Sequence, residues 1–214
     1  MTIGPPRAAR GPLVLFDIGG YTSFLQAVAA AHADDAFADG AVPPAYAVLS
    51  NLLDGIVGAI VPPMTLAKLE GDAVFAYGTE EASIPRGREL LGWLAAVYAD
   101  FDGRLDQAKD LWSCSCDACI RLDQLDLKAV VHAGSFVLSG IAGREELTGP
   151  QVVLAHRLLK SAAAQVAETS AYALLTSAAV DALAVPTSDG RPLTESVEHY
   201  GPVACVVFDL RTAP

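Results

Sequence analysis

Short apolar runs that alternate with helical patterns constrain the fold of this chain more than any other feature. Leu13–Ile18 is such a run and ends in two glycines, which is typical of a buried strand. Tyr21–Ala31, Ala45–Ile60 and Arg86–Leu111 instead have the pattern of helices. Between the second and third of these, Met64–Tyr77 predicts a hairpin that turns around a Gly-Asp pair. This order of elements predicts an α+β domain.

The second half of the chain continues the alternation. We expect a strand at Leu127–Ala133, a helix from Pro150 to about Ala164, a strand at Tyr172–Leu175, a short helix at Ser177–Leu183 and a final strand at Val203–Leu210. The Gly-rich stretch that leads to Gly149 is only weakly patterned. The whole order predicts a mostly antiparallel sheet with helices packed on it.

The size and composition of the chain fit one domain, because 52% of its 214 residues are hydrophobic. We expect residues 1–12 to form a flexible tail and residues 13–214 to form a single domain. Asp17 interrupts the first apolar run, and no uninterrupted apolar stretch reaches the ~18 residues of a membrane span. The first residues also lack the pattern of a signal peptide. The sequence therefore predicts a cytoplasmic protein without membrane insertion.

The charge of the chain argues against a nucleic-acid partner. The formal net charge is -11 and the sequence pI is about 4.6, so the surface repels phosphate backbones at long range. A small nucleotide is not excluded, because a divalent cation held by carboxylates can bind its phosphates locally.

Two aspartates stand at positions where a carboxylate requires an explanation. Asp17 ends an apolar strand, and Asp72 follows the glycine of the predicted hairpin. A carboxylate within a buried run is costly unless it is paired or holds a cation. Two of them at neighbouring strand ends could form a two-metal or Mg-triphosphate site. The alternative is that Asp17 caps the next helix and Asp72 is an ordinary turn residue.

Three sequence blocks resemble motifs of the class III adenylyl and guanylyl cyclases. Phe16–Phe24, FDIGGYTSF, resembles the first-strand motif, and Lys68–Ala76, KLEGDAVFA, resembles the hairpin motif. Leu147–Arg157 resembles the Gly-x-x-Val-x-x-Ala-x-Arg helix. The blocks occur in the family's order and spacing. The resemblance implies a ferredoxin-like core and a head-to-tail homodimer with nucleotide sites at its interface.

The resemblance also implies roles for individual residues. Asp17 and Asp72 would hold two divalent cations, Mg²⁺ or Mn²⁺, with help from the Ile18 carbonyl. The chemistry would be that of a phosphorus-oxygen lyase: the ribose 3′-hydroxyl attacks the α-phosphate and pyrophosphate leaves.

Three further positions would contact the nucleotide. Lys68 matches the lysine that selects adenine and favours ATP among the nucleoside triphosphates. Glu146 falls where an acidic or hydroxyl partner reads the base, and Arg157 matches the arginine that stabilises charge on the reacting phosphate.

Two departures from the family pattern concern the phosphate side of the site. The family has an Asn four residues before the Arg, and here that position is Val153, which makes no side-chain hydrogen bond. Near the C-terminus the family has a Lys-Gly pair, and the best alignment here reads Tyr200-Gly201. The catalytic set is therefore incomplete.

A cysteine cluster is the other unusual feature. Cys114, Cys116 and Cys119 lie in a loop at about residues 112–122, and a poorly characterised branch of cyclase-like proteins has a similar cluster. Three thiolates at this spacing suit Zn²⁺, which needs a fourth ligand. An iron–sulfur cluster, or reduced cysteines without metal, are the alternatives.

The fourth ligand is left open by the sequence. His132, Cys205 or a residue of a second subunit could supply it, while His32 is expected at the surface. Three hypotheses remain for the whole chain: an adenylate cyclase, a cyclase-like nucleotide- or metal-binding sensor or scaffold, and an interaction domain whose only ligand is a structural zinc.

Overall fold

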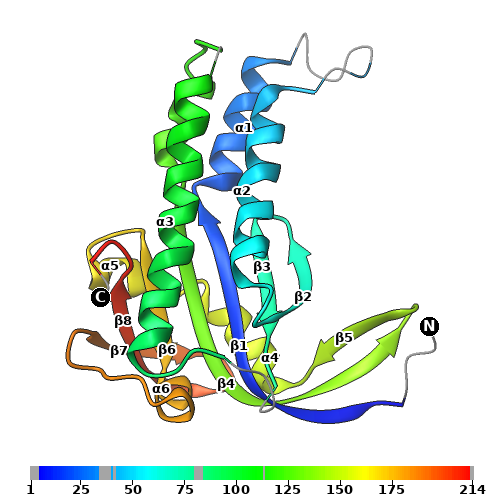
Figure 1. Cartoon of the computed structure of the whole chain (residues 1–214), viewed down its shortest axis with the longest axis vertical. Coiled ribbons are helices and arrows are strands. Elements are labelled where there is room, and N and C mark those ends of the chain that lie inside the picture. The colour runs from blue at the N-terminus through cyan, green and yellow to red at the C-terminus, as the bar shows by residue number, and fades with distance from the viewer. Residues whose placement is uncertain (1–4, 34–39, 41, 80–83, 113, 213–214) are drawn as a thin grey trace.

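An eight-stranded sheet organises the computed structural model, which describes residues 5–33, 40, 42–79, 84–112 and 114–212. Seven strands follow the order β2-β3-β1-β4-β6-β8-β7, and β5 pairs with β4 beside this path (Figure 1). The pairing of β4 with β6 is parallel, and the other strand pairs are antiparallel. The mostly antiparallel α+β architecture predicted from the sequence is confirmed.

Strands and helices alternate along the chain. The strands are β1 (Arg7–Gly19), β2 (Thr65–Glu70), β3 (Ala73–Tyr77), β4 (Asp126–Ile141), β5 (Arg144–Thr148), β6 (Tyr172–Thr176), β7 (Arg191–Val197) and β8 (Gly201–Asp209). The α-helices are α1 (Tyr21–Ala31), α2 (Pro44–Ile60), α3 (Arg88–Leu111), α4 (Pro150–Leu158), α5 (Ala163–Ala167) and α6 (Ser177–Leu183), and a 3-10 helix, η2, covers Cys119–Gln124.

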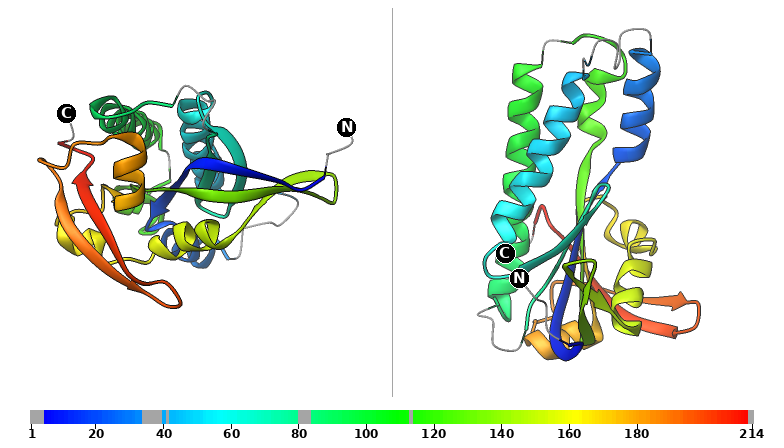
Figure 2. Two further views of the ribbon diagram at one scale, coloured as in Figure 1. Left: turned by 90° about the horizontal axis from the view of Figure 1, so that it is seen from below. Right: turned by 90° about the vertical axis from the view of Figure 1, so that its right-hand side faces the viewer.

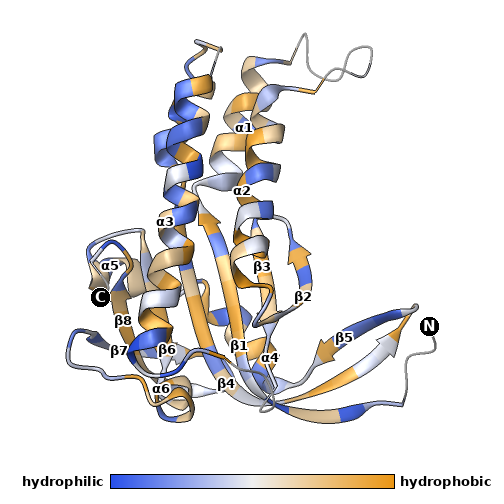
Figure 3. Ribbon diagram, viewed as in Figure 1, coloured by the Kyte–Doolittle hydropathy of each residue, from blue (hydrophilic) through white to orange (hydrophobic). Residues whose placement is uncertain are grey.

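Both faces of the central strands are covered, which explains their nearly continuous apolar runs. In β1, Val14, Phe16 and Ile18 pack into a core cluster shared with α1, α2 and α3. The alternate residues Leu13 and Leu15 belong to a second cluster on the opposite face, under α4 and α5. The helices therefore form separate layers on the two faces of the sheet (Figure 2), and hydrophobic residues fill the middle of β1 and β4 (Figure 3).

The first strand is longer than the sequence predicted. It begins at Arg7, because residues 7–12 pair with the second half of β4. Part of the segment expected to be a flexible tail therefore belongs to the sheet, while residues 1–4 lie outside the described residues. The long ends of β1 and β4 project from the sheet together with β5 as an arm (Figure 1).

Two strands were missed because their apolar pattern is weak. β5 closes a hairpin with β4 through Ala142 and Gly143, both with positive φ, in the stretch that we found only weakly patterned. β7 alternates between exposed and half-buried residues at the edge of the sheet, so it has no fully buried position to mark it. Pairing with a neighbour, rather than burial, defines both strands.

No helix among the described residues is long and apolar enough to cross a membrane.

Candidate functional site

The sheet register places a row of charged side chains on the face covered by α4. Asp17 of β1 lies opposite Ala73 of β3 on one side and Lys128 of β4 on the other, and Glu70 of β2 lies opposite Ala73. Directly opposed residues of neighbouring strands point to the same face of a sheet. Glu70, Asp17 and Lys128 therefore form one polar row beside the apolar residues that α4 covers.

Asp72 lies near Asp17, in the turn between β2 and β3. Gly71 precedes it with a φ of 66°, and the Asp72 carbonyl accepts a hydrogen bond of 3.2 Å from the Ile18 backbone N–H. Burial raises the pKa of the Asp72 carboxyl above its ordinary value, and the charge of Asp17 raises it further. The two predicted metal ligands thus repel each other, a repulsion that a shared divalent cation would relieve.

Lys128 balances part of this negative charge within the protein. Its ammonium lies 2.8 Å from the Asp17 carboxylate and also donates a hydrogen bond of 3.3 Å to the Leu159 carbonyl at the end of α4. Both side chains are largely buried, so this pair is shielded from solvent more than a surface ion pair. A cation that binds Asp17 must share the carboxylate with Lys128 or displace its ammonium.

A pocket of about 770 Å³ opens on the same side of the molecule, between the end of β2, α4 and β7. Its polar lining residues include Lys68, Glu70, His156, Arg157, Lys160, Glu195 and Glu198. Lys68 and Arg157, predicted to contact base and phosphate, are therefore brought together on one pocket. Asp17 and Asp72 are not among the residues that line it.

Glu70 is held between two basic side chains of this pocket. The Lys68 ammonium lies 2.6 Å from one carboxylate oxygen, and His156 Nε2 lies 2.9 Å from the other. Burial raises the pKa of Glu70, but the hydrogen bond from Lys68 and the charge of His156 together outweigh burial and hold the pKa below its ordinary value. In this state Lys68 is engaged by a carboxylate of its own chain.

Arg157, which also lines the pocket, is engaged in a similar way. Its guanidinium donates a hydrogen bond of 2.9 Å to the Glu198 carbonyl and lies 3.3 Å from the Glu198 carboxylate. Val153, one helical turn earlier, also lines the pocket and is 47% exposed. The position where the cyclase pattern has an amide is therefore an apolar surface facing the pocket.

Two other sequence-predicted positions lie away from this chemistry. Tyr200 donates its hydroxyl to the Pro150 carbonyl over 2.7 Å, which fastens the turn between β7 and β8 to the start of α4. Glu146 lies on β5 opposite Ser139 and is not among the residues that line the pocket.

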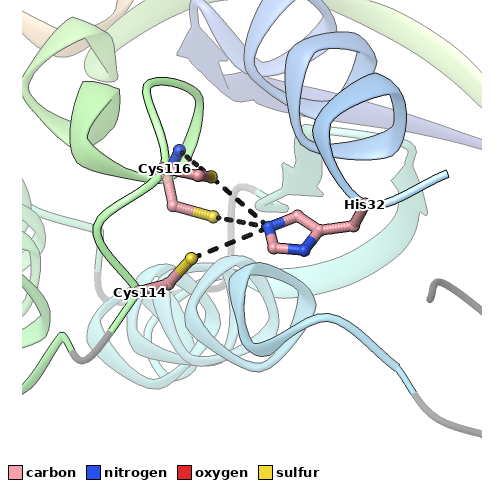
Figure 4. A group of neighbouring side chains, drawn as sticks. His32, Cys114 and Cys116 are labelled. Carbon is pink, nitrogen blue, oxygen red and sulfur yellow. Dashed lines mark hydrogen bonds between the residues drawn. The ribbon is translucent and has the colours of Figure 1, made fainter. Parts of the chain in front are cut away.

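The cysteine cluster forms a second candidate site, whose fourth member the sequence did not identify. His32, which follows α1, places its Nε2 atom 3.3 Å from Cys119 Sγ. The same atom lies 3.4 Å from Cys116 Sγ and 3.7 Å from Cys114 Sγ (Figure 4). One ligand atom from each of the four residues lies within 4.8 Å of all the others. The set could hold a metal ion.

The candidates first considered for this fourth position are engaged elsewhere. His132 is buried in the sheet between Thr176 and Gln151, which lie 2.8 Å and 2.7 Å from its two ring nitrogens. Cys205 lies in the second core cluster, where its thiol donates to the Val203 carbonyl. The expectation that His32 is a plain surface residue was wrong: its ring is half-buried against the cysteines. A histidine 82 residues away from the first cysteine gives no local sequence signal.

Solved structures with a similar fold include nucleotide cyclases and a cyclase-like protein. The adenylyl cyclase CyaB from P. aeruginosa has a TM-score of 0.64 and 15% identity, with 99% of this chain and 100% of that chain covered. A bacterial light-regulated adenylyl cyclase has a TM-score of 0.62 and 13% identity over 98% of this chain, which spans about half (54%) of that longer chain. The chain therefore has the fold of a class III cyclase catalytic domain.

A third similar structure is a class III adenylyl cyclase-like ATP-binding protein from Pseudomonas aeruginosa, with a TM-score of 0.59 and 14% identity, covering 86% of this chain and 36% of that one. In sequence, residues 49–168 match the family described as "Protein of unknown function (DUF2652)". "Uncharacterized protein Rv2561/Rv2562" of Mycobacterium tuberculosis (strain ATCC 25618 / H37Rv) is 30% identical over 168 residues, 77% of this chain and 74% of that protein. The chain belongs to the DUF2652 family.

The charge balance around Glu70 leads to a first prediction. Lys68→Met removes the hydrogen bond that lowers the pKa of Glu70, so this pKa should rise as burial is opposed by His156 alone. Because the folded-state pKa is depressed, the Lys68–Glu70 contact stabilises the fold above the unfolded pKa of Glu70. That contribution is lost as the pH falls through the folded value.

Carboxyl ¹³C NMR titration of the glutamates would measure this shift. Lys109→Met, which removes an exposed ion pair with Asp106 on α3, is the matched control and should leave Glu70 unchanged. If Glu70 titrates identically in the wild type and in Lys68→Met, the described contact does not control its charge.

Proposed function

We propose that this protein binds a nucleoside triphosphate, with ATP favoured, together with Mg²⁺ or Mn²⁺ at a cyclase-like site. The observation that carries the proposal is the pair of repelling carboxylates, Asp17 at the end of β1 and Asp72 in the turn before the neighbouring strand β3. Their oxygen ligands suit hard divalent cations. The cyclase fold supports this proposal, and so does the pocket that contains Lys68 and Arg157, which opens on the face of the sheet where Asp17 lies.

Asp17 and Asp72 would hold the cations, with the Ile18 carbonyl beside them. When bound, such ions polarise the phosphates and favour ionisation of the attacking hydroxyl. Lys128 would hold the Asp17 carboxylate in place and balance its charge while no cation is present. The Asp17–Lys128 pair therefore stabilises the site without a ligand. A bound metal-nucleotide complex would balance the charge of the carboxylates further.

Lys68 would contact the base of the nucleotide, and Arg157 would contact its phosphates. Both are now paired with acids, Glu70 and Glu198, so nucleotide binding would require each to exchange an internal partner for the ligand. Asp17 and Asp72 do not line the pocket of these two residues. We infer that a head-to-tail homodimer completes the site, with the carboxylates of one copy facing the pocket of the other.

Turnover of the bound nucleotide to cyclic AMP and pyrophosphate is the first candidate activity. The second is a nucleotide-binding sensor or scaffold without turnover, and Val153 favours it because an apolar side chain cannot orient the ribose or the transition state by a hydrogen bond. Loss of one such hydrogen bond costs roughly 10²–10³ in rate. We therefore expect binding to be easier to detect than cyclisation.

The binding proposal predicts that two aspartates carry metal-dependent affinity. Asp17→Ala with Asp72→Ala should abolish Mn²⁺-dependent ATP binding measured by titration calorimetry, because the cation loses both carboxylates. Asp181→Ala on α6 removes an exposed carboxylate outside this site and should bind like the wild type. Equal binding by wild type and the double variant would refute the assignment.

The incomplete catalytic set predicts a gain of activity. Val153→Asn should raise Mn²⁺-dependent formation of cyclic AMP by roughly 10-fold or more, because it restores a hydrogen-bonding amide one turn before Arg157. The side chain is half-exposed, so the fold should tolerate the change. Val153→Leu is the control of similar size and should not raise the rate. Unchanged activity in Val153→Asn, with ATP binding intact, would favour the sensor.

A further inference from the structure

The four-residue cluster of His32, Cys114, Cys116 and Cys119 has a geometry that hydrogen bonding does not explain. A single imidazole nitrogen, Nε2 of His32, lies 3.3–3.7 Å from three different sulfur atoms. That nitrogen carries either one proton or one lone pair, so it can make one good hydrogen bond and not three. Three thiols gathered on one nitrogen are better explained by an ion that all four atoms share.

The spacing matches a tetrahedral ion. With Zn–N of 2.0–2.1 Å and Zn–S of 2.3 Å, a tetrahedron places its nitrogen about 3.5 Å from each sulfur. The observed nitrogen–sulfur distances of 3.3, 3.4 and 3.7 Å lie on either side of this value. We propose that His32, Cys114, Cys116 and Cys119 bind one Zn²⁺ ion.

The compactness of the cluster argues against the other metal groups. All four ligand atoms lie within 4.8 Å of one another, which suits a single ion, whereas an iron–sulfur cluster spreads its ligands around two or more metal atoms. Three cysteines and one histidine also supply all four ligands of a tetrahedral ion. A closed set of four protein ligands is typical of structural zinc rather than of a catalytic ion with an open position.

A second contact orients one of the ligands. The Cys119 backbone N–H donates a hydrogen bond of 3.4 Å to Cys116 Sγ. The Cys-x-x-Cys turn of residues 116–119 therefore orients the Cys116 sulfur through its own backbone. Hydrogen bonds of this kind fix the orientation of metal ligands and stabilise their charged form. The loop is therefore arranged for an ion before the ion arrives.

The ion would fasten two segments that lead into the nucleotide site. His32 follows α1, which begins soon after Asp17, and Cys119 begins η2, which leads into β4 and Lys128. The two segments also meet at Gly20, where a Cβ atom would lie 2.5 Å from the Gln124 carbonyl oxygen. Zinc would link the C-terminal end of α1 to the start of η2. This link would help to keep the β1–α1 turn packed against η2.

Metal analysis of the purified full-length protein tests the site. Mass spectrometry should find about one zinc per chain in the wild type, and His32→Ala and Cys114→Ser should each reduce this to near zero. His199→Ala and Cys205→Ala replace residues of the same types outside the cluster and should keep the zinc. The double variant Asp17→Ala/Asp72→Ala should also keep it, which separates this proposal from the nucleotide site.

Cobalt substitution of the wild type avoids any dependence on how the variants fold. Removing zinc with a chelator and adding Co²⁺ should give thiolate-to-cobalt absorption and the visible bands of a tetrahedral ion, at one equivalent per chain. Zinc removal should also speed amide hydrogen exchange in α1 and η2 and leave α6 unchanged. A zinc-free wild type that gains no tetrahedral cobalt spectrum would overturn the proposal, as would unchanged exchange in α1 and η2.

Discussion

The antiparallel pairing of β1 with β4 is the interaction on which the rest of the structure depends. It runs along the whole of β1 and sets Asp17 opposite Lys128. Because helices cover both faces, a shift of one residue would exchange the side chains of Leu15 and Phe16 between two different core clusters. The same shift would move Asp17 away from the α4 face. Burial of the core thus fixes the register, and the register fixes the charged row of the candidate site.

The charges of this row explain how an acidic site can exist without its ligand. Two of the acids on the α4 side have basic neighbours from the same chain: Lys128 lies beside Asp17, and Lys68 and His156 lie beside Glu70. The pKa of Asp72 is raised, because burial and the nearby charge of Asp17 both disfavour its charged form. A metal-nucleotide complex would bring both a cation for the acids and phosphates for the bases, so both sets of internal pairs could exchange partners together.

The sequence predicted the elements whose apolar residues are buried. It failed for two strands with weak apolar patterns and for one contact between residues far apart in the sequence. Asp17 and Asp72 could be placed together because a strand end and a hairpin turn are local patterns, and β1 and β3 are neighbours in the sheet. β5 and β7 were missed because neither strand has an apolar face of several residues. His32 was missed for a different reason: only the packing of α1 against η2 brings it to the cysteines, and no local spacing encodes that contact.

The central claim is that the carboxylates of Asp17 and Asp72 hold the cation of a bound nucleotide. A crystal structure with Mn²⁺ and a non-cyclisable ATP analogue, with diffraction recorded at the manganese absorption edge, tests this most directly. The proposed site predicts an anomalous peak within about 2.5 Å of oxygens of both aspartates, with the triphosphate beside Arg157 of the second copy. A bound analogue whose manganese lies elsewhere, or an anomalous map without a peak at these residues, would contradict the assignment.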